Sequence, residues 1–206
     1  RQTGLDQNTI IVFTSDHGYH LGEHGHWQKQ TLFENATRVP LIFSIPRFKT
    51  TINRNNSPVE LIDIYPTIMD LLDIKIPNHV VGKSLKPIML KNSSNIRNSA
   101  LTKWRNGYSI RTEQYRITKW GENGELGYEL YDHSKDHQEL NNLANDTSNL
   151  KLLDSLKTII DTRISEANVI PVGIGRQFIN VKALNKAPNL TFGDLHNERG
   201  KRTFFK

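Results

Sequence analysis

Cysteine is absent from the 206 residues of this chain. Disulfide bonds and thiolate metal sites are therefore excluded within it, and the sequence gives no sign of the redox compartment. Long apolar runs are missing as well. The longest, at residues 10–13 and 40–43, are far shorter than the roughly 20 residues that a membrane-spanning helix needs. We therefore expect no membrane partner.

Acidic residues are scarce in one part of the chain. Residues 168–206 hold seven Lys or Arg residues against Asp194 and Glu198, so this tail carries most of the formal net charge of +6. A solvated extension is the plain interpretation of such a tail, and contact with a polyanion is the alternative. We expect no nucleic-acid partner, because the basic residues are not interleaved with a run of stacking aromatics.

The first half of the chain has the pattern of an α/β core. Residues 10–14 form a short β-branched apolar run, which predicts a strand buried on both faces of a mostly parallel sheet. Residues 40–45 predict a second buried strand. Apolar residues recur at helical spacing over residues 61–72, which predicts a helix packed on the sheet, with Pro66 breaking or starting it.

The second half has a different periodicity. Alternation with period two over residues 107–112 and 115–120 predicts a β-hairpin, and residues 128–131 predict a third strand. Apolar residues at helical spacing then predict an amphipathic helix over residues 150–164, capped near Thr147 or Ser148 and packed on the small sheet.

Three regions follow from this change of pattern. We expect an α/β core portion at residues 1–95, a small antiparallel-sheet and helix subdomain at residues 96–167, and a basic irregular extension at residues 168–206. The polar stretch at residues 92–98 suits the junction between the first two. Proline and glycine interrupt the periodicity of the extension.

Ionisable residues are concentrated just after the first expected strand. In open α/β sheets, functional groups gather beyond the carboxyl ends of the strands, and Asp16 and His17 occupy that position here. The carboxylate suits calcium or magnesium, whereas the imidazole equally suits zinc or manganese, so the residues alone leave the metal open. A turn with a helix cap is the plainer alternative for this segment.

A functional role for Lys29 is suggested only by the residues near it in the sequence. A lone lysine is normally solvated surface, but a lysine beside a bound cation makes a site for a tetrahedral oxyanion. Glu23 can orient a histidine or cap the turn that follows. Three more histidines are expected to be surface or outer groups rather than metal ligands: His20, His24 and His26.

An ordered series of motifs resembles the sulfatase family of the alkaline-phosphatase superfamily. The first part of the series is Ser15-Asp16-His17-Gly18, Leu21-Gly22-Glu23-His24-Gly25, Trp27, Lys29 and Arg38-Val39-Pro40-Leu41-Ile42. The later part is Pro58-Val59-Glu60-Leu61-Ile62-Asp63-Ile64-Tyr65-Pro66-Thr67, Gly107–Thr112, Tyr115-Arg116, Glu129-Leu130-Tyr131-Asp132 and Leu140-Asn141-Asn142-Leu143-Ala144. The resemblance covers about residues 5–167 and is strongest to the iduronate-2-sulfatase-like branch.

This resemblance implies part of an alkaline-phosphatase-like α/β/α sandwich followed by a small α+β subdomain. It also implies a calcium site with Asp16 and His17 as two ligands, Lys29 as the catalytic lysine that binds the substrate sulfate, and Tyr19 as a side chain of the substrate pocket. The expected substrate is a sulfated carbohydrate such as a glycosaminoglycan or an algal polysaccharide. A periplasmic, secreted or lysosomal location is usual in the family.

The resemblance also implies that part of the site comes from elsewhere. The family's nucleophile is a formylglycine made from Cys or Ser in a Cys/Ser-X-Pro/Ala-X-Arg motif, and the sequence contains no such motif. We therefore expect the formylglycine and the other metal ligands to come from an amino-terminal half that acts as the partner of this chain.

Two other functions are compatible with the residues. A phosphatase or phosphodiesterase of the same superfamily also uses an Asp-His pair after a strand, in a two-metal site. The spacing of Gly22-Glu23-His24-Gly25 and Lys29 favours sulfate. A non-catalytic module that binds an acidic polysaccharide through the small sheet and the basic tail is the third interpretation.

Overall fold

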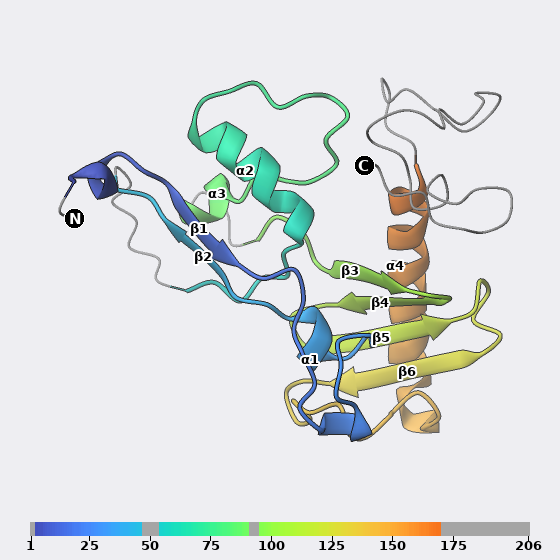
Figure 1. The fold of residues 1–206 in the computed structure, drawn as a ribbon. Coiled ribbons are helices and arrows are strands. Elements are labelled where there is room, and N and C mark those ends of the chain that lie inside the picture. The colour runs from blue at the N-terminus through green and yellow to red at the C-terminus, as the bar shows by residue number, and fades with distance from the viewer. Residues whose placement is uncertain (1–2, 47–53, 91–94, 170–206) are drawn as a thin grey trace, which may run out of the picture. The chain divides into compact units, whose positions relative to one another are not determined.

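The computed structural model describes residues 3–46, 54–90 and 95–169, which form two antiparallel sheets with flanking helices (Figure 1). The described residues belong to one compact unit, residues 1–170. The mixed α/β class predicted from the sequence is confirmed. The basic extension predicted at residues 168–206 lies outside the described residues, apart from Asn168 and Val169. Within the described ranges, no helix is long and apolar enough to cross a membrane.

The first sheet has two strands, β1 (Ile11–Thr14) and β2 (Leu41–Ser44). Both strands were predicted, but the predicted parallel arrangement and burial are wrong for this pair. The strands are antiparallel, and the side chains of Phe13 and Ile42 are 59% and 57% exposed. Local composition favours a strand, whereas its direction and burial depend on which elements pack against it.

The helix predicted over residues 61–72 is confirmed. A 3-10 turn (Leu61–Asp63) leads into α2 (Ile64–Leu71), and α3 (Lys86–Met89) follows. Pro66 lies in the first turn of α2, where its missing N–H breaks no intrahelical hydrogen bond, so it starts the helix rather than breaking it. The Glu60 and Asp63 side chains form a reciprocal capping box at this start.

The second sheet has four strands in consecutive order, and every neighbouring pair is antiparallel. The predicted hairpin and third strand are confirmed as β4 (Gly107–Arg111), β5 (Tyr115–Trp120) and β6 (Gly127–Asp132). The edge strand β3 (Ala100–Trp104) was not predicted. In this short strand Leu101 and Lys103 lie on the same face, so that face is not consistently apolar and the pattern is too weak to be recognised without its partner β4.

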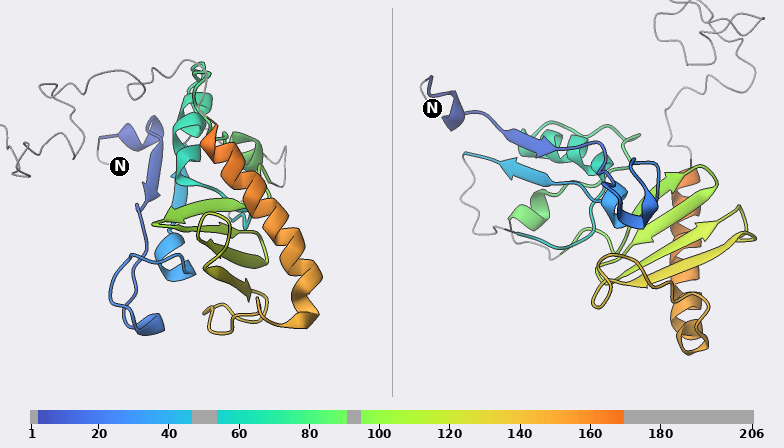
Figure 2. Two further views of the ribbon diagram at one scale, coloured as in Figure 1. Left: turned by 90° about the vertical axis from the view of Figure 1, so that its right-hand side faces the viewer. Right: turned by 60° about the horizontal axis from the view of Figure 1, so that its bottom comes forward.

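One face of this sheet carries the main apolar core. Helix α4 (Leu150–Asn168) lies across that face (Figures 1 and 2). The fully buried apolar residues of the strands are Ile110, Ile117 and Leu130, and they share one cluster with Leu153, Leu156 and Ile160 of the helix. Complete burial of each such side chain contributes roughly 1.5–3 kcal/mol to stability. The predicted helix is confirmed, but the cap lies one residue before the predicted pair, because the Asp146 side chain accepts from the Ser148 N–H.

The opposite face of the sheet is polar and contacts the first half of the chain. Arg116 on β5 donates to Thr37 Oγ1 at 3.0 Å and to Glu34, both of α1 (Glu34–Thr37). Arg111 on β4 also donates to Glu34. The segment between β1 and β2 is therefore attached to the second sheet by charged groups, and the buried Leu32 and the Phe33–Tyr131 ring contact add apolar packing.

Candidate functional site

The loop after β1 is held in place by α1. The Gly18 N–H donates to the Ala36 carbonyl oxygen at 2.8 Å. A Cβ atom on Gly18 would lie 1.9 Å from the Asn35 carbonyl oxygen, so only glycine allows this approach. The short helix therefore determines where residues 15–18 lie.

Asp16, His17 and Lys29 come together at this loop. His17 Nδ1 lies 2.6 Å from the Gly18 carbonyl oxygen, which can only accept a hydrogen bond, so Nδ1 carries the proton. His17 Nε2 then carries the lone pair of the ring and accepts from Lys29 Nζ at 2.6 Å. The same nitrogen is 3.5 Å from Asp16 Oδ2. A carboxylate, an imidazole and an ammonium group thus share one small region at the carboxyl end of β1.

The Asp16 carboxylate is available to a ligand. Its side chain is 83% exposed, and Oδ1 accepts from the His17 N–H at 3.1 Å. Desolvation opposes ionisation, but the electrostatic influence of His17 and Lys29, together with backbone hydrogen bonds, lowers the pKa of Asp16 below its ordinary value. The group is therefore an anion at neutral pH.

These donors fit a divalent cation. A histidine whose Nδ1–H is held by a carbonyl presents Nε2 as a metal ligand in a fixed orientation. Asp16 adds an ionised oxygen ligand beside it. Calcium prefers six to eight oxygen ligands, so the two residues make up only part of a calcium site. The donor set alone does not distinguish calcium from the other divalent metals considered above.

Tyr19 lies in the same loop but is separate from this group. Its side chain is 52% exposed. Within the described residues, no hydrogen bond joins its hydroxyl to Asp16, His17 or Lys29. Its assignment to the substrate pocket stays a prediction.

The remaining ionisable groups of the loop have structural contacts. His20 is fully buried rather than a surface residue, and its Nε2 bonds Thr31 Oγ1 at 2.7 Å. Burial lowers the pKa of His20, so it stays neutral. His24 stacks on Phe33 with ring centroids 3.9 Å apart. Glu23 accepts from the Leu21 N–H and stabilises the turn before it rather than the one after it.

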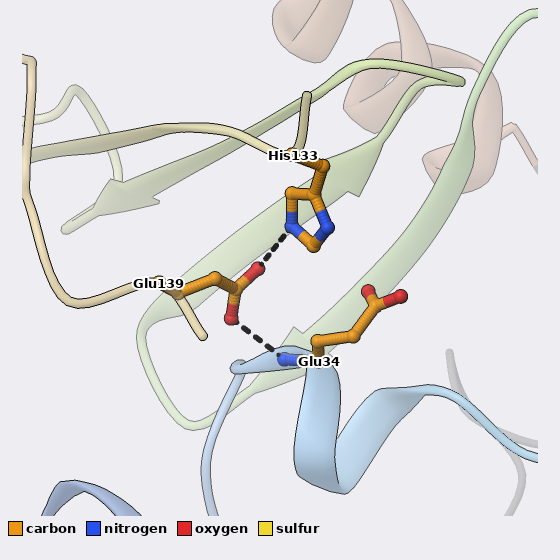
Figure 3. A group of neighbouring side chains, drawn as sticks. All are labelled: Glu34, His133 and Glu139. Carbon is orange, nitrogen blue, oxygen red and sulfur yellow. Dashed lines mark hydrogen bonds and ion pairs between the residues drawn. The ribbon is translucent and has the colours of Figure 1, made fainter. Parts of the chain in front are cut away.

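A second cluster of ionisable residues went unnoticed in the sequence. Glu34, His133 and Glu139 bring their ligand atoms within 4.8 Å of one another (Figure 3). Glu139 accepts from His133 Nε2 and from the Glu34 N–H, each at 2.7 Å. More than a hundred residues separate Glu34 from Glu139 along the chain, and no local motif links them.

This second cluster has the ligand types of a metal site but already contains a cation. Arg116, with a side chain only 2% exposed, donates to both Glu34 and Glu139 at 2.5 Å. Desolvation raises the pKa of each glutamate, but hydrogen bonds and the nearby arginine charge outweigh it, so both pKa values lie below the ordinary one. A metal ion would have to displace the guanidinium. We therefore assign the cluster a structural role.

Comparison with known proteins identifies relatives over most of the described region. The family described as N-sulphoglucosamine sulphohydrolase, C-terminal, matches residues 22–166, a range that includes Lys29 but begins after Asp16, His17 and Tyr19. The chain is 34% identical over 155 residues to a sulfatase of Formosa agariphila, covering 75% of this chain and 30% of that protein. It is 33% identical over 157 residues to arylsulfatase K of Bos taurus, covering 70% of this chain and 29% of that protein.

Solved structures agree with this result. A 2-O GAG sulfatase superposes with a TM-score of 0.71 at 28% identity, over 78% of this chain and 37% of that one. A structure in complex with its substrate D-glucosamine-2-N,6-O-disulfate has a TM-score of 0.67 at 27% identity. A phosphonate monoester hydrolase from Silicibacter pomeroyi has a TM-score of 0.70 at 26% identity. Each of these two matches covers 82% of this chain and 37% of the other chain. The chain thus spans less than two-fifths of the length of these relatives.

Proposed function

Since the chain belongs to the sulfatase family, within the group described as N-sulphoglucosamine sulphohydrolase, C-terminal, we propose that the full protein is a sulfuric ester hydrolase acting on a sulfated carbohydrate. The observation that carries this proposal is the convergence of Asp16, His17 and Lys29 at the end of β1. The more specific assignment to the iduronate-2-sulfatase-like branch of the family remains a prediction.

In this proposal Asp16 and His17 hold a calcium ion, which when bound would neutralise negative charge on the sulfate oxygens. A formylglycine in an amino-terminal half would supply the nucleophile. The contribution of this chain is electrostatic. The Gly18 carbonyl oxygen keeps the proton of His17 on Nδ1, so Nε2 carries the lone pair that would bind the ion in place of Lys29.

Lys29 has the second role, as the group that binds the substrate sulfate. Its ammonium lies 2.6 Å from His17 Nε2 and is therefore already beside the atoms proposed to bind the metal ion. A compact ammonium has three donors and suits a tetrahedral oxyanion. A fixed positive charge there stabilises charge that develops during the reaction, and Tyr19 is proposed to line the sugar side of the site.

The predicted division of the chain belongs to the same proposal. We place the contribution to the catalytic core in residues 1–95 and the small subdomain in residues 96–167, with residues 168–206 as an extension. The placement of α2 and α3 before this boundary, and of the second sheet with α4 after it, supports the division.

A phosphoryl-transfer enzyme is the second candidate, because a phosphonate monoester hydrolase is among the structural neighbours. The neighbour bound to D-glucosamine-2-N,6-O-disulfate and the name of the 2-O GAG sulfatase support the sulfated sugar instead. A second metal ion in the purified protein, measured by elemental analysis, would favour phosphoryl transfer.

The decisive experiment compares substrates. The full protein should hydrolyse an aryl sulfate and a sulfated glucosamine faster than the matching phosphonate monoester. Residues 1–206 alone should hydrolyse none of them, because the nucleophile and the other metal ligands are proposed to lie elsewhere. Turnover of the aryl sulfate by the isolated chain would contradict the proposed division of the site, and a preference for the phosphonate would contradict the sulfatase assignment.

A further inference from the structure

The side chains of Trp104 and Trp120 lie on the polar face of the four-stranded sheet, and Gly107 lies between them. Trp104 pairs with Gly107, and Gly107 pairs with Trp120, so the three positions share one face across β3, β4 and β5. A Cβ atom on Gly107 would lie 2.6 Å from the six-membered ring of Trp120 and 2.8 Å from a methyl group of Leu32. The glycine therefore leaves room for the Trp120 ring to lie over the strand.

The two indoles line a pocket of about 290 Å³. The other walls come from the turn after β3, from β6 and from the segment on both sides of Lys29, and their polar residues are Arg105, Asn106, Glu129, His26, Gln30 and Thr31. All of these residues belong to the described part of the chain. The pocket is distinct from the group formed by Asp16, His17 and Lys29, none of which lines it.

The polar groups of the pocket can both donate and accept hydrogen bonds. Trp120 Nε1–H donates to Glu129 Oε1 at 3.1 Å, which fixes the carboxyl group on the wall formed by β6. Burial raises the pKa of this carboxyl. Arg105 lies 5.6 Å from the ring centroid of Trp104, and the amide side chains of Gln30 and Asn106 complete the lining. The pocket thus combines flat apolar surfaces with an acceptor, a cation and two amides.

We propose that this pocket is a subsite for one pyranose ring of a saccharide, separate from the ring that carries the reacting sulfate. The inference rests on the proposed function, which supplies the carbohydrate substrate. A sugar ring has apolar C–H faces that an indole can cover and a rim of hydroxyl groups that needs both donors and acceptors. The volume lies at the small end of the usual range for ligand pockets, which suits a single ring.

The positive charge of Arg105 predicts that this subsite prefers a sugar ring with an acidic group. Arg105 is the cation of the lining and adopts a left-handed backbone conformation with φ of 51° in the turn between β3 and β4. Its guanidinium can form paired hydrogen bonds with a carboxylate or a sulfate group on the ring. Since Gln30 and Thr31 follow Lys29 directly, one segment lines the pocket and carries the proposed sulfate-binding lysine. A ring with an acidic substituent is therefore the expected occupant.

The test measures binding by isothermal titration calorimetry on the full protein. The probes are tetrasaccharides of heparin, chondroitin sulfate and carrageenan. Trp104→Ala should weaken the tightest of them about tenfold or more, as is typical when an aromatic anchor of a binding site is removed. Arg105→Ala should weaken only probes that carry an acidic group near the indoles. The matched control is Trp27→Ala, which removes an indole that is 68% exposed and outside the pocket.

Misfolding is separated from loss of the subsite by a conservative variant. Trp104→Phe retains a flat ring and should keep most of the affinity, with a thermal melt like that of the wild type. The proposal is overturned if none of the probes binds, or if Trp104→Ala weakens binding no more than Trp27→Ala does.

The same variants distinguish failure of the subsite from failure of the proposed function. Trp104→Ala should leave turnover of a small aryl sulfate unchanged, because that substrate does not reach the pocket. Lys29→Ala should lose that turnover and keep the Trp104-dependent binding of the tetrasaccharide. A wild-type protein that binds the probe through Trp104 but hydrolyses no sulfate ester would refute the sulfatase proposal alone. Normal hydrolysis with Trp104-independent binding would refute the subsite alone.

Discussion

Two clusters in this chain each combine carboxylate, imidazole and a cationic side chain, and they differ in what surrounds them. The loop cluster consists of Asp16, His17 and Lys29. The buried cluster consists of four residues: Glu34, Arg116, His133 and Glu139. In the buried cluster each carboxylate accepts from the guanidinium of Arg116. In the loop cluster the carboxylate is exposed, and the imidazole nitrogen is paired with a lysine that is itself exposed.

The difference shows that residue types alone do not identify a metal site. A buried charge is stable only when it is paired and hydrogen-bonded, and such pairing uses the atoms that a ligand would need. An exposed cluster is less costly to leave partly unpaired. The four predictions that follow test this contrast, from the largest expected effect to the smallest.

Asp16→Ala in the full protein should abolish bound calcium and sulfatase activity together. Removing an ionised ligand leaves the ion without enough donors. Elemental analysis and an aryl sulfate assay check the two effects. Asp154→Ala, which removes an exposed carboxylate on α4, is the matched control and should keep both. Unchanged metal content in the Asp16 variant would remove the metal assignment.

Arg116→Ala should lower the free energy of unfolding by roughly 3–5 kcal/mol, because it leaves the buried Glu139 without its guanidinium and the partly buried Glu34 with Arg111 alone. Urea denaturation followed by circular dichroism measures the change. Lys135→Ala is the control: its side chain is 83% exposed and lies 4.0 Å from Asp132. That variant should change the free energy by no more than about 0.5 kcal/mol. Similar values for the two variants would show that the buried cluster is not structural.

Lys29→Ala should lower turnover by roughly 100-fold, the effect typical of losing one preorganised electrostatic donor. Metal content and the thermal melt should stay close to those of the wild type. Lys29→Arg should restore little activity, because a planar guanidinium does not replace a compact ammonium. Steady-state kinetics measures the effect, and near-normal turnover of the alanine variant would make Lys29 an ordinary surface residue.

Lowering the pH should reduce the free energy of unfolding, because it protonates the glutamates of the buried cluster. The folded pKa values of Glu34 and Glu139 lie below the ordinary value of 4.5, so the unfolded chain binds more protons between the two values. Their contribution to stability is fully present above about pH 4.5 and falls as the pH drops through the folded pKa. Glu34→Gln should flatten this part of the stability curve, measured by urea denaturation at a series of pH values. A curve parallel to the wild type would contradict the assignment.

Local periodicity was enough to predict the elements with strong patterns. The hairpin of β4 and β5 and the helix α4 were recognised because their apolar residues repeat with the period of their own backbone. The strand β3 was missed, since its single helix-facing leucine becomes informative only when β4 pairs with it. The antiparallel pairing of β1 and β2 was not predicted either, because strand direction depends on partners distant in sequence.

The sequence by itself determined the family and the residues of the loop cluster, because Asp16, His17 and Lys29 lie within a short segment with a distinctive spacing. Only the tertiary structure decided which charged groups are free. It brings Glu34 to Glu139 across more than a hundred residues, and Trp104 to Trp120 across two strand pairings. The physical reason is that electrostatic pairing and burial act through space, so a linear pattern contains the groups but not their neighbours.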